Sequence, residues 1–294
     1  MSLSQGELYT FVTNKAGKGK KGTMVAVIKG TLSKDIINVL MKLSAEKRLL
    51  VKEVTLDMAN NMELAARSAF LNAQLVTDRF HVVKLCLEAL QHLRTTFRWA
   101  EIDKENTAIK IAKDARANYN KKLKEYENDP QKREKLIKTT DPSKHKYEAE
   151  ILENGDTPKQ LLARSKYILA KKKDSWTQNQ SERAAILFKK YPELEHWYNE
   201  TLAFRNIYED TNKQSAKTRF IEWIKKVNEN EMKVFYSVAN TIENNLDNIL
   251  NFFTNRNTNA NAESFNSKIK LFRANQRGVV DTTFFLFRLH KLFA

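Results

Sequence analysis

The spacing of apolar residues along the chain changes from the period of a strand to the period of a helix. β-Branched and aromatic residues over Glu7–Asn14 and Thr23–Gly30 predict two strands, and the Gly-punctuated segment between them, KAGKGKKG, predicts an antiparallel hairpin. Apolar residues over Ser33–Leu43 recur at helical spacing, with Ser33 as the expected N-cap. Val51–Met58 then returns to strand character.

A second strand and a long helix follow. Glu63–Phe70 predicts a short helix and Ala73–Thr77 a strand, after which Asp78 precedes a long helical pattern. One face of that helix is expected to carry Val83, Cys86, Leu90, Leu93 and Phe97. The front part of the chain is therefore predicted to be α/β.

The middle of the chain predicts helices only. Thr157 before Pro158 is a typical helix start, and Thr177 with Gln180 forms a capping box. Within this block, residues 104–154 are densely charged and are interrupted by Pro130 and Pro142, which indicates an exposed basic insertion of helix and loop.

The last segment has an Asn-rich beginning, a basic helix, a break at Gly278 and a closing aromatic helix, TTFFLFRLHKLF. We expect three parts: residues 1–98 as the first part of an α/β core, 99–251 as an all-helical insertion, and 252–294 as the last part of the core. The chain as a whole should be mostly helical.

Composition supports a folded, helix-rich protein. Of the 294 residues, 41% are hydrophobic and 29% are charged, and only 7 Gly and 4 Pro occur, which disfavours a many-stranded β architecture. The lone Cys86 excludes an internal disulfide, and neither a secretory segment nor a membrane span is evident, so we expect a cytoplasmic protein. The net charge of +16 suggests a polyanionic partner, although charge alone is weak evidence.

Acidic residues follow two of the predicted strands. Asp57 and Asp78 lie at strand exits, where ligands of open α/β sheets bind, so together they could hold a divalent cation. The alternative is that each only caps the following helix. His81, three residues after Asp78, could point back to the strand ends or simply pack in the core.

Glu263 belongs to a polar helix face that suits a cation site beside a phosphate site, although an ordinary solvated face is an equal alternative. That face comprises Asn259, Glu263, Asn266 and Lys270, and the opposite face comprises Phe265, Ile269 and Phe272. Four basic residues follow Glu263 on this helix. They could contact phosphates, or they could simply form an ordinary basic surface, and they are Lys268, Lys270, Arg273 and Arg277.

Three motifs together resemble one family. TLDM around Asp57, VTDRFHV over Val76–Val82 and TNANAESFNSKIK over Thr258–Lys270 are similar to the bacterial insertion-sequence transposases of the DDE type, in particular the ISL-three family. The closing RGVVDTTFFLFRLHKLF also matches, and the resemblance covers essentially the whole chain.

The resemblance implies a ribonuclease H-like core interrupted by a helical insertion, and metal-dependent cleavage and strand transfer at insertion-sequence ends. Asp57 would be the second catalytic acid and Glu263 the last, both binding metal, while Asp78 and His81 would form the family's DxxH element. Asn259 and Asn266 would support the site. An intact relative is expected to use two Mg²⁺ or Mn²⁺ ions about 4 Å apart, with DNA as partner and a homo-oligomer in the synaptic complex.

One departure from the family concerns the first catalytic aspartate. Relatives carry it in an Ile-Asp-Glu strand directly before the segment that resembles LSQGELYT, where this sequence has Met1. We therefore expect a core without its central first strand and a chain inactive alone, unless that strand is supplied upstream or in trans. The rival hypothesis is a non-catalytic, basic, helical nucleic-acid-binding protein.

Overall fold

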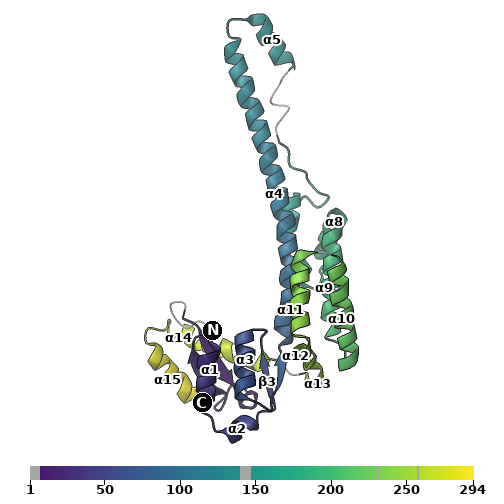
Figure 1. Cartoon of the computed structure of the whole chain (residues 1–294). Coiled ribbons are helices and arrows are strands. Elements are labelled where there is room, and N and C mark those ends of the chain that lie inside the picture. The colour runs from purple at the N-terminus through teal and green to yellow at the C-terminus, as the bar shows by residue number, and fades with distance from the viewer. Residues whose placement is uncertain (1–6, 140–146, 231, 257) are drawn as a thin grey trace. The chain divides into compact units, whose positions relative to one another are not determined.

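The computed structural model describes residues 7–139, 147–230, 232–256 and 258–294, and it is mostly helical with four short strands in these ranges (Figure 1). The chain divides into two compact units. The first comprises residues up to Leu85 together with Phe204–Ala294, and the second comprises Cys86–Ala203. The predicted division into three parts, at residues 98 and 251, remains a prediction.

The first unit begins with the predicted hairpin. Strands β1 (Tyr9–Thr13) and β2 (Met24–Lys29) pair antiparallel, with a register shift between Val12 and Thr13. Strands β3 (Glu53–Leu56) and β4 (Gln74–Thr77) form a separate two-stranded parallel sheet. The predicted strands are confirmed, and each is one to four residues shorter than its sequence pattern.

The helices of the first unit follow the predicted order, with some corrections. Ser33 is the first residue of α1 and not its cap, because the preceding Leu32 is extended and its carbonyl accepts the first helical hydrogen bonds. The helix before β4 begins earlier than its apolar pattern suggested, at Asn60. The bounds are α1 Ser33–Leu40, α2 Ala45–Leu49, α3 Asn60–Ala69, α10 Lys213–Glu229, α11 Lys233–Asn244, α12 Leu246–Leu250, α13 Phe252–Asn255, α14 Ala260–Asn275 and α15 Thr282–Phe293.

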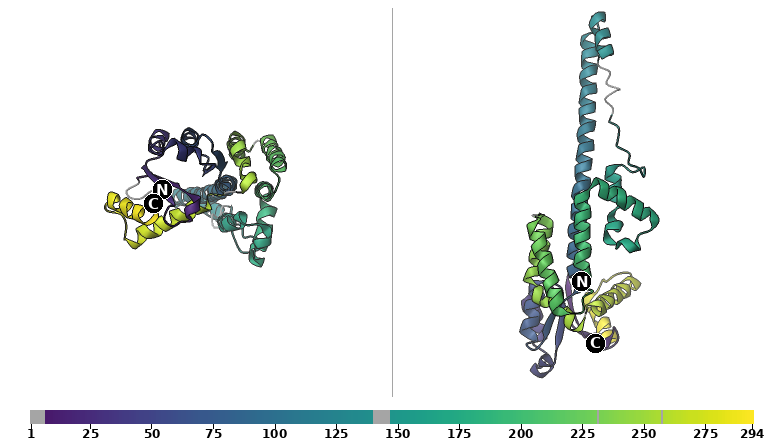
Figure 2. Two further views of the ribbon diagram at one scale, coloured as in Figure 1. Left: turned by 90° about the horizontal axis from the view of Figure 1, so that it is seen from below. Right: turned by 90° about the vertical axis from the view of Figure 1, so that its right-hand side faces the viewer.

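Alternating side chains of the hairpin bury both of its faces. Tyr9, Phe11 and Met24 pack with the apolar face of α14 and α15. Val12 and Ile28 pack with α1 and α3 on the other face. Figure 2 shows the purple hairpin with yellow α14 and α15 on one side and the blue helices on the other. Burial on both faces, a consequence of the two-residue period of a strand, therefore fixes α14 against the hairpin.

A third apolar region attaches α10–α13 to the parallel sheet. Tyr208 and Phe253 stack with their ring centroids 5.8 Å apart, and Phe220 lies edge-on to Tyr208 at 5.6 Å. The Asn251 side-chain amide donates to the Leu75 carbonyl of β4 at 2.8 Å. The segment that leads to α14 is thereby connected to the strand that leads to Asp78.

Two helices continue from one compact unit into the other. Helix α4 (Arg79–Glu125) has 47 residues, and α9 is Pro192–Ile207. The sequence contains neither Gly nor Pro within α4, so nothing in the backbone interrupts it. Near its start the fully buried residue is Val82 and not the predicted Val83, which is half-buried.

The second unit is all-helical in its described residues, as predicted for this segment. The predicted helix starts at Thr157 and Thr177 are confirmed, because the N–H of each donates to a Gln side chain three residues later. Pro130 begins a helix, whereas the predicted break at Pro142 lies outside the described residues. Helices with bounds within this unit are α5 Pro130–Thr139, α6 Pro158–Arg164, α7 Lys166–Ala170 and α8 Gln178–Lys190.

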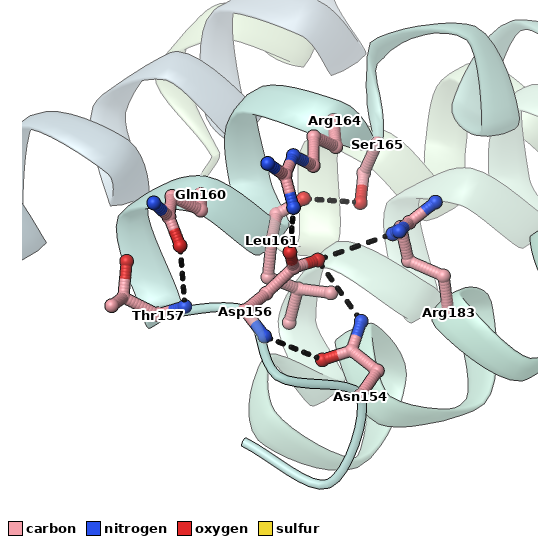
Figure 3. A network of polar contacts seen from close by, with 8 residues as sticks. All are labelled: Asn154, Asp156, Thr157, Gln160, Leu161, Arg164, Ser165 and Arg183. Carbon is pink, nitrogen blue, oxygen red and sulfur yellow. Dashed lines mark hydrogen bonds and ion pairs between the residues drawn. The ribbon is translucent and has the colours of Figure 1, made fainter. Parts of the chain in front are cut away.

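A buried carboxylate organises the start of α6. Asp156 is 1% exposed and accepts from Asn154 at 2.9 Å and from Arg183 at 3.2 Å, and it is also ion-paired with Arg164 (Figure 3). Three donors from separate positions in the sequence compensate the burial of one negative charge. No described helix of either unit is both long enough and apolar enough to cross a membrane.

We expect Asp156→Ala to lower the free energy of unfolding by about 2 kcal/mol or more, because it leaves two guanidinium groups without their charged acceptor. Urea denaturation followed by circular dichroism measures this. Asp129→Ala, which removes an exposed carboxylate paired with Lys132, is the control and should cost clearly less, because solvent screens the exposed pair. Equal losses in the two variants would contradict the role assigned to Asp156.

Burial also raises the pKa of the Cys86 thiol well above its ordinary value. Cys86 should therefore resist a maleimide reagent in the folded protein and react in about 6 M guanidinium chloride, where the thiol is exposed. Mass spectrometry after labelling measures this, and rapid modification of the folded chain would show that the start of α4 is not packed as described.

Candidate metal centre

The two strand-exit carboxylates lie at the same edge of the parallel sheet. Leu56 of β3 is aligned with Thr77 of β4, and the Asp78 N–H donates to the Leu56 carbonyl at 2.9 Å. Asp57 and Asp78 thus follow neighbouring strands at corresponding positions. This confirms the sequence prediction that both acids lie at strand exits, and the structure adds that the two strands are neighbours.

One oxygen of Asp78 performs the predicted capping role. The Asp78 side chain is 2% exposed, and its Oδ1 accepts from the N–H of Phe80, in the first turn of α4, at 3.4 Å. The same oxygen accepts from the N–H of Asn259, directly before α14, at 3.4 Å. A single carboxylate oxygen therefore connects the N-terminal ends of two helices that are far apart in the sequence.

The second oxygen of Asp78 is not explained by capping. Asp78 Oδ2 is buried and has no hydrogen-bond partner among the residues that the structure describes. Its neighbour is His81, whose Nε2 lies 3.9 Å from it. A buried carboxylate oxygen without a donor is costly, so this oxygen is suited to a positively charged ligand.

Glu263 completes a group of three. It lies in the first turn of α14, and one ligand atom each from Asp78, His81 and Glu263 lies within 4.8 Å of the other two. His81 and Glu263 are accessible to solvent, whereas Asp78 is buried. Separations of this size allow one cation to contact all three groups, so the arrangement fits a divalent metal ion.

The donor types also fit such an ion. Two carboxylates and one imidazole suit Mg²⁺ or Mn²⁺, and the imidazole nitrogen favours Mn²⁺ of the two. The unpartnered oxygen of Asp78 is the strongest sign, because a purely structural carboxylate would have its oxygens hydrogen-bonded.

Asp57 lies beside this group and is not one of the three. Its Oδ1 accepts from the N–H of Ala59 at 3.2 Å, a local turn that leads into α3. The sequence predicted Asp57 and Glu263 as the metal-binding pair, with Asp78 and His81 in support. The structure brings Glu263 together with Asp78 and His81, and the role of Asp57 in binding metal stays a prediction.

The predicted faces of α14 are present. Phe265 and Ile269 are buried and Phe272 packs against the same cluster, so Asn259, Glu263 and Asn266 lie on the other side. Asn259 contributes its backbone N–H to the site through Asp78. Asn266 is half-buried, and its predicted supporting role remains a prediction.

The basic residues of this region have different surroundings. Lys270 and Arg277 are exposed, Arg273 is half-buried, and Lys268 Nζ donates to the Gly19 carbonyl in the hairpin turn at 3.1 Å. Sequence reasoning did not connect this turn with α14. The run of lysines in KAGKGKKG was the available signal, but its position beside α14 depends on the packing of the hairpin.

We expect Asp78→Asn and Glu263→Gln each to weaken Mn²⁺ binding more than about 10-fold, because each removes a charged ligand. Isothermal titration calorimetry measures the affinity. Asp35→Asn, which changes an acid in the first turn of α1, is the matched control and should leave the affinity unchanged. Unchanged affinity in both site variants would show that these residues do not form a metal centre.

Comparisons with known proteins agree with the motifs at this site. The model of a DDE transposase family of the ISL-three type, described as "Transposase", matches residues 1–289. A search of curated proteins and a search of solved structures each found no match. Because the family model spans nearly the whole sequence and includes Asp78, His81 and Glu263, the chain belongs to the ISL-three family of DDE transposases.

Proposed function

We propose that this chain is the catalytic region of a transposase that cleaves and joins DNA at insertion-sequence ends with divalent metal ions. The observation that carries the proposal is the convergence of Glu263, near the end of the chain, with Asp78 and His81 at the start of α4. Family membership indicates the class of reaction, which is transposition. The group of Asp78, His81 and Glu263 is the site where we propose that it takes place.

A ribonuclease H-like core with an open central position is part of the proposal. Among the described residues the strands form two separate pairs, β1–β2 and β3–β4. Lys15, just after β1, connects the two pairs, since its Nζ lies 3.0 Å from Glu53 Oε1 and 2.7 Å from Thr55 Oγ1 in β3. Val12 and Val54 also pack against one cluster. This arrangement supports a place for a fifth strand between β1 and β3.

A further strand at this position would bring the first catalytic aspartate that the family resemblance implies. Val12 of β1 and all four residues of β3 are only half-buried, which is unusual for the central strands of a core and leaves room beside them for another strand. A strand there would pair with both sheets and place its carboxylate near Asp57 and Asp78. We therefore infer that residues 1–294 supply two of the three acids and do not cleave DNA by themselves.

The residues present have separate parts in the proposed reaction. Asp78, His81 and Glu263 would hold one metal ion, and Asp57, at the neighbouring strand exit, would contribute to metal binding beside them. The bound ion would supply Lewis-acid stabilisation of the phosphodiester and activate the attacking hydroxyl. Asp78 would hold the start of α14 in place through its Oδ1, so that Glu263 stays directed at the strand exits. Lys270 and Arg277, further along α14, would bind the phosphate backbone.

The rival function is a non-catalytic nucleic-acid-binding protein whose acids only cap helices. The turn at Asp57 and the contact of Asp78 with Phe80 favour it. It does not account for the buried, unpartnered Oδ2 of Asp78 or for the approach of Glu263. We therefore prefer the transposase.

DNA cleavage tests the inactivity directly. With Mg²⁺ or Mn²⁺ and labelled insertion-sequence ends, the chain as given should cleave no faster than its Asp57→Ala variant, because both lack an essential acid. Robust metal-dependent cleavage by the chain as given would contradict the claim that it is inactive alone.

An N-terminal extension tests the rest of the proposal. Fusing a strand of the Ile-Asp-Glu type before the hairpin should restore cleavage, and the same extension with Asn in place of Asp is the matched control. In the restored protein, Glu263→Gln should lower the rate more than about 100-fold, since loss of a supporting partner alone costs 10–100-fold. Cleavage that survives Glu263→Gln would show that the site lies elsewhere.

A further inference from the structure

We propose that the hairpin turn between β1 and β2 is a second contact for the DNA phosphate backbone, beside the metal centre. This inference rests on the proposed function and extends it to Lys18, Lys20 and Lys21. Neither the family motifs nor the basic residues of α14 include these three lysines.

The turn is held in one conformation by its own hydrogen bonds. The Asn14 N–H donates to the Thr23 carbonyl at 2.8 Å, and the Asn14 side chain accepts from Ala16 at 3.0 Å. Gly19 has a φ of 72°, which a residue with a side chain rarely adopts, and a Cβ there would approach Lys268 Nζ to 2.6 Å. The lysines therefore project from a defined backbone, which lowers the entropic cost of binding through them.

The charge of the turn is not neutralised locally. Lys15 pairs with Glu53, whereas Lys18, Lys20 and Lys21 are exposed and have no carboxylate within ion-pair distance in the described part of the chain. The sequence contains no acid from residue 8 to residue 34. Several exposed ammonium groups without acids nearby attract a polyanion.

Helix α14 connects the turn with the metal centre. Lys268, which donates to the turn at Gly19, is five residues after Glu263, or about 7.5 Å further along the helix axis. The surface of α14 between Glu263 and Lys268 includes the exposed Ser264 and Ser267. Their small side chains permit close approach of a nucleic-acid backbone. About two phosphates of one strand would span this axial distance.

The cations lie on both sides of Glu263. By helical periodicity, Lys270 lies about two turns further along the same face as Glu263. Arg273 lies on one flank of that face, and Lys268 with the turn lies on the other. A strand that crosses α14 at Glu263 would therefore meet positive charge before and after the metal centre. Because lysines act as point charges and the turn contains no aromatic residue, this contact should bind phosphates without reading bases.

The test is DNA binding in the presence of EDTA, which separates it from catalysis. Fluorescence anisotropy with a labelled DNA duplex is measured over a salt series for the triple variant Lys18→Gln, Lys20→Gln, Lys21→Gln. The matched control makes the same change at Lys34 of α1, at Lys42 between α1 and α2, and at Lys47 of α2. These three lysines are exposed, and α1 packs on the other face of the hairpin. Circular dichroism checks that both variants fold.

The turn variant should bind more than about 10-fold more weakly, and the slope of log K against log salt should fall by about 2 to 3, since each lost phosphate contact contributes about 0.9. The control should change the slope by less than about 1. Equal effects in both variants, or no effect in the turn variant, would overturn this inference alone. Absence of DNA binding by the unmodified chain would instead contradict the proposed function.

Discussion

The site depends on one buried carboxylate. Asp78 leaves a strand of the parallel sheet, and its Oδ1 accepts backbone N–H groups from the first turn of α4 and from the residue before α14. Its other oxygen stays buried without a donor, next to His81 and Glu263. The same side chain thus holds two helix starts together and presents an oxygen that has no hydrogen-bond donor in the described chain. A structural role and a ligand role are compatible because they use different oxygens.

Packing far from this carboxylate makes the convergence possible. The hairpin buries one face against α14 and α15 and the other against α1 and α3, which fixes the helix that carries Glu263. Asn251 attaches the segment before α14 to β4, the strand that leads to Asp78. Residues separated by about two-thirds of the sequence therefore meet through contacts within one compact unit.

Local patterns predicted the elements well because the period of apolar residues and the helix caps are local properties. The hairpin, the strands β3 and β4 and the capping box at Thr177 are examples. The full length of α4 was not predicted, because its apolar face was followed only to Phe97 and the densely charged residues from 104 onward were assigned to an exposed insertion of helix and loop. The contacts of Asp156 with Arg164 and Arg183 were missed as well, since they depend on tertiary packing. The residues of the site were predicted individually. The grouping of Glu263 with Asp78 and His81 was not, because it depends on the tertiary packing of α14.

The central claim is that these three side chains share one divalent cation. Anomalous scattering at the manganese absorption edge, from crystals of the chain grown with Mn²⁺, tests it most directly. The account predicts an anomalous peak in contact with Asp78 Oδ2, the His81 imidazole and the Glu263 carboxylate. A structure at the same Mn²⁺ concentration with no peak there, and with Asp78 Oδ2 hydrogen-bonded to a protein donor, would contradict it.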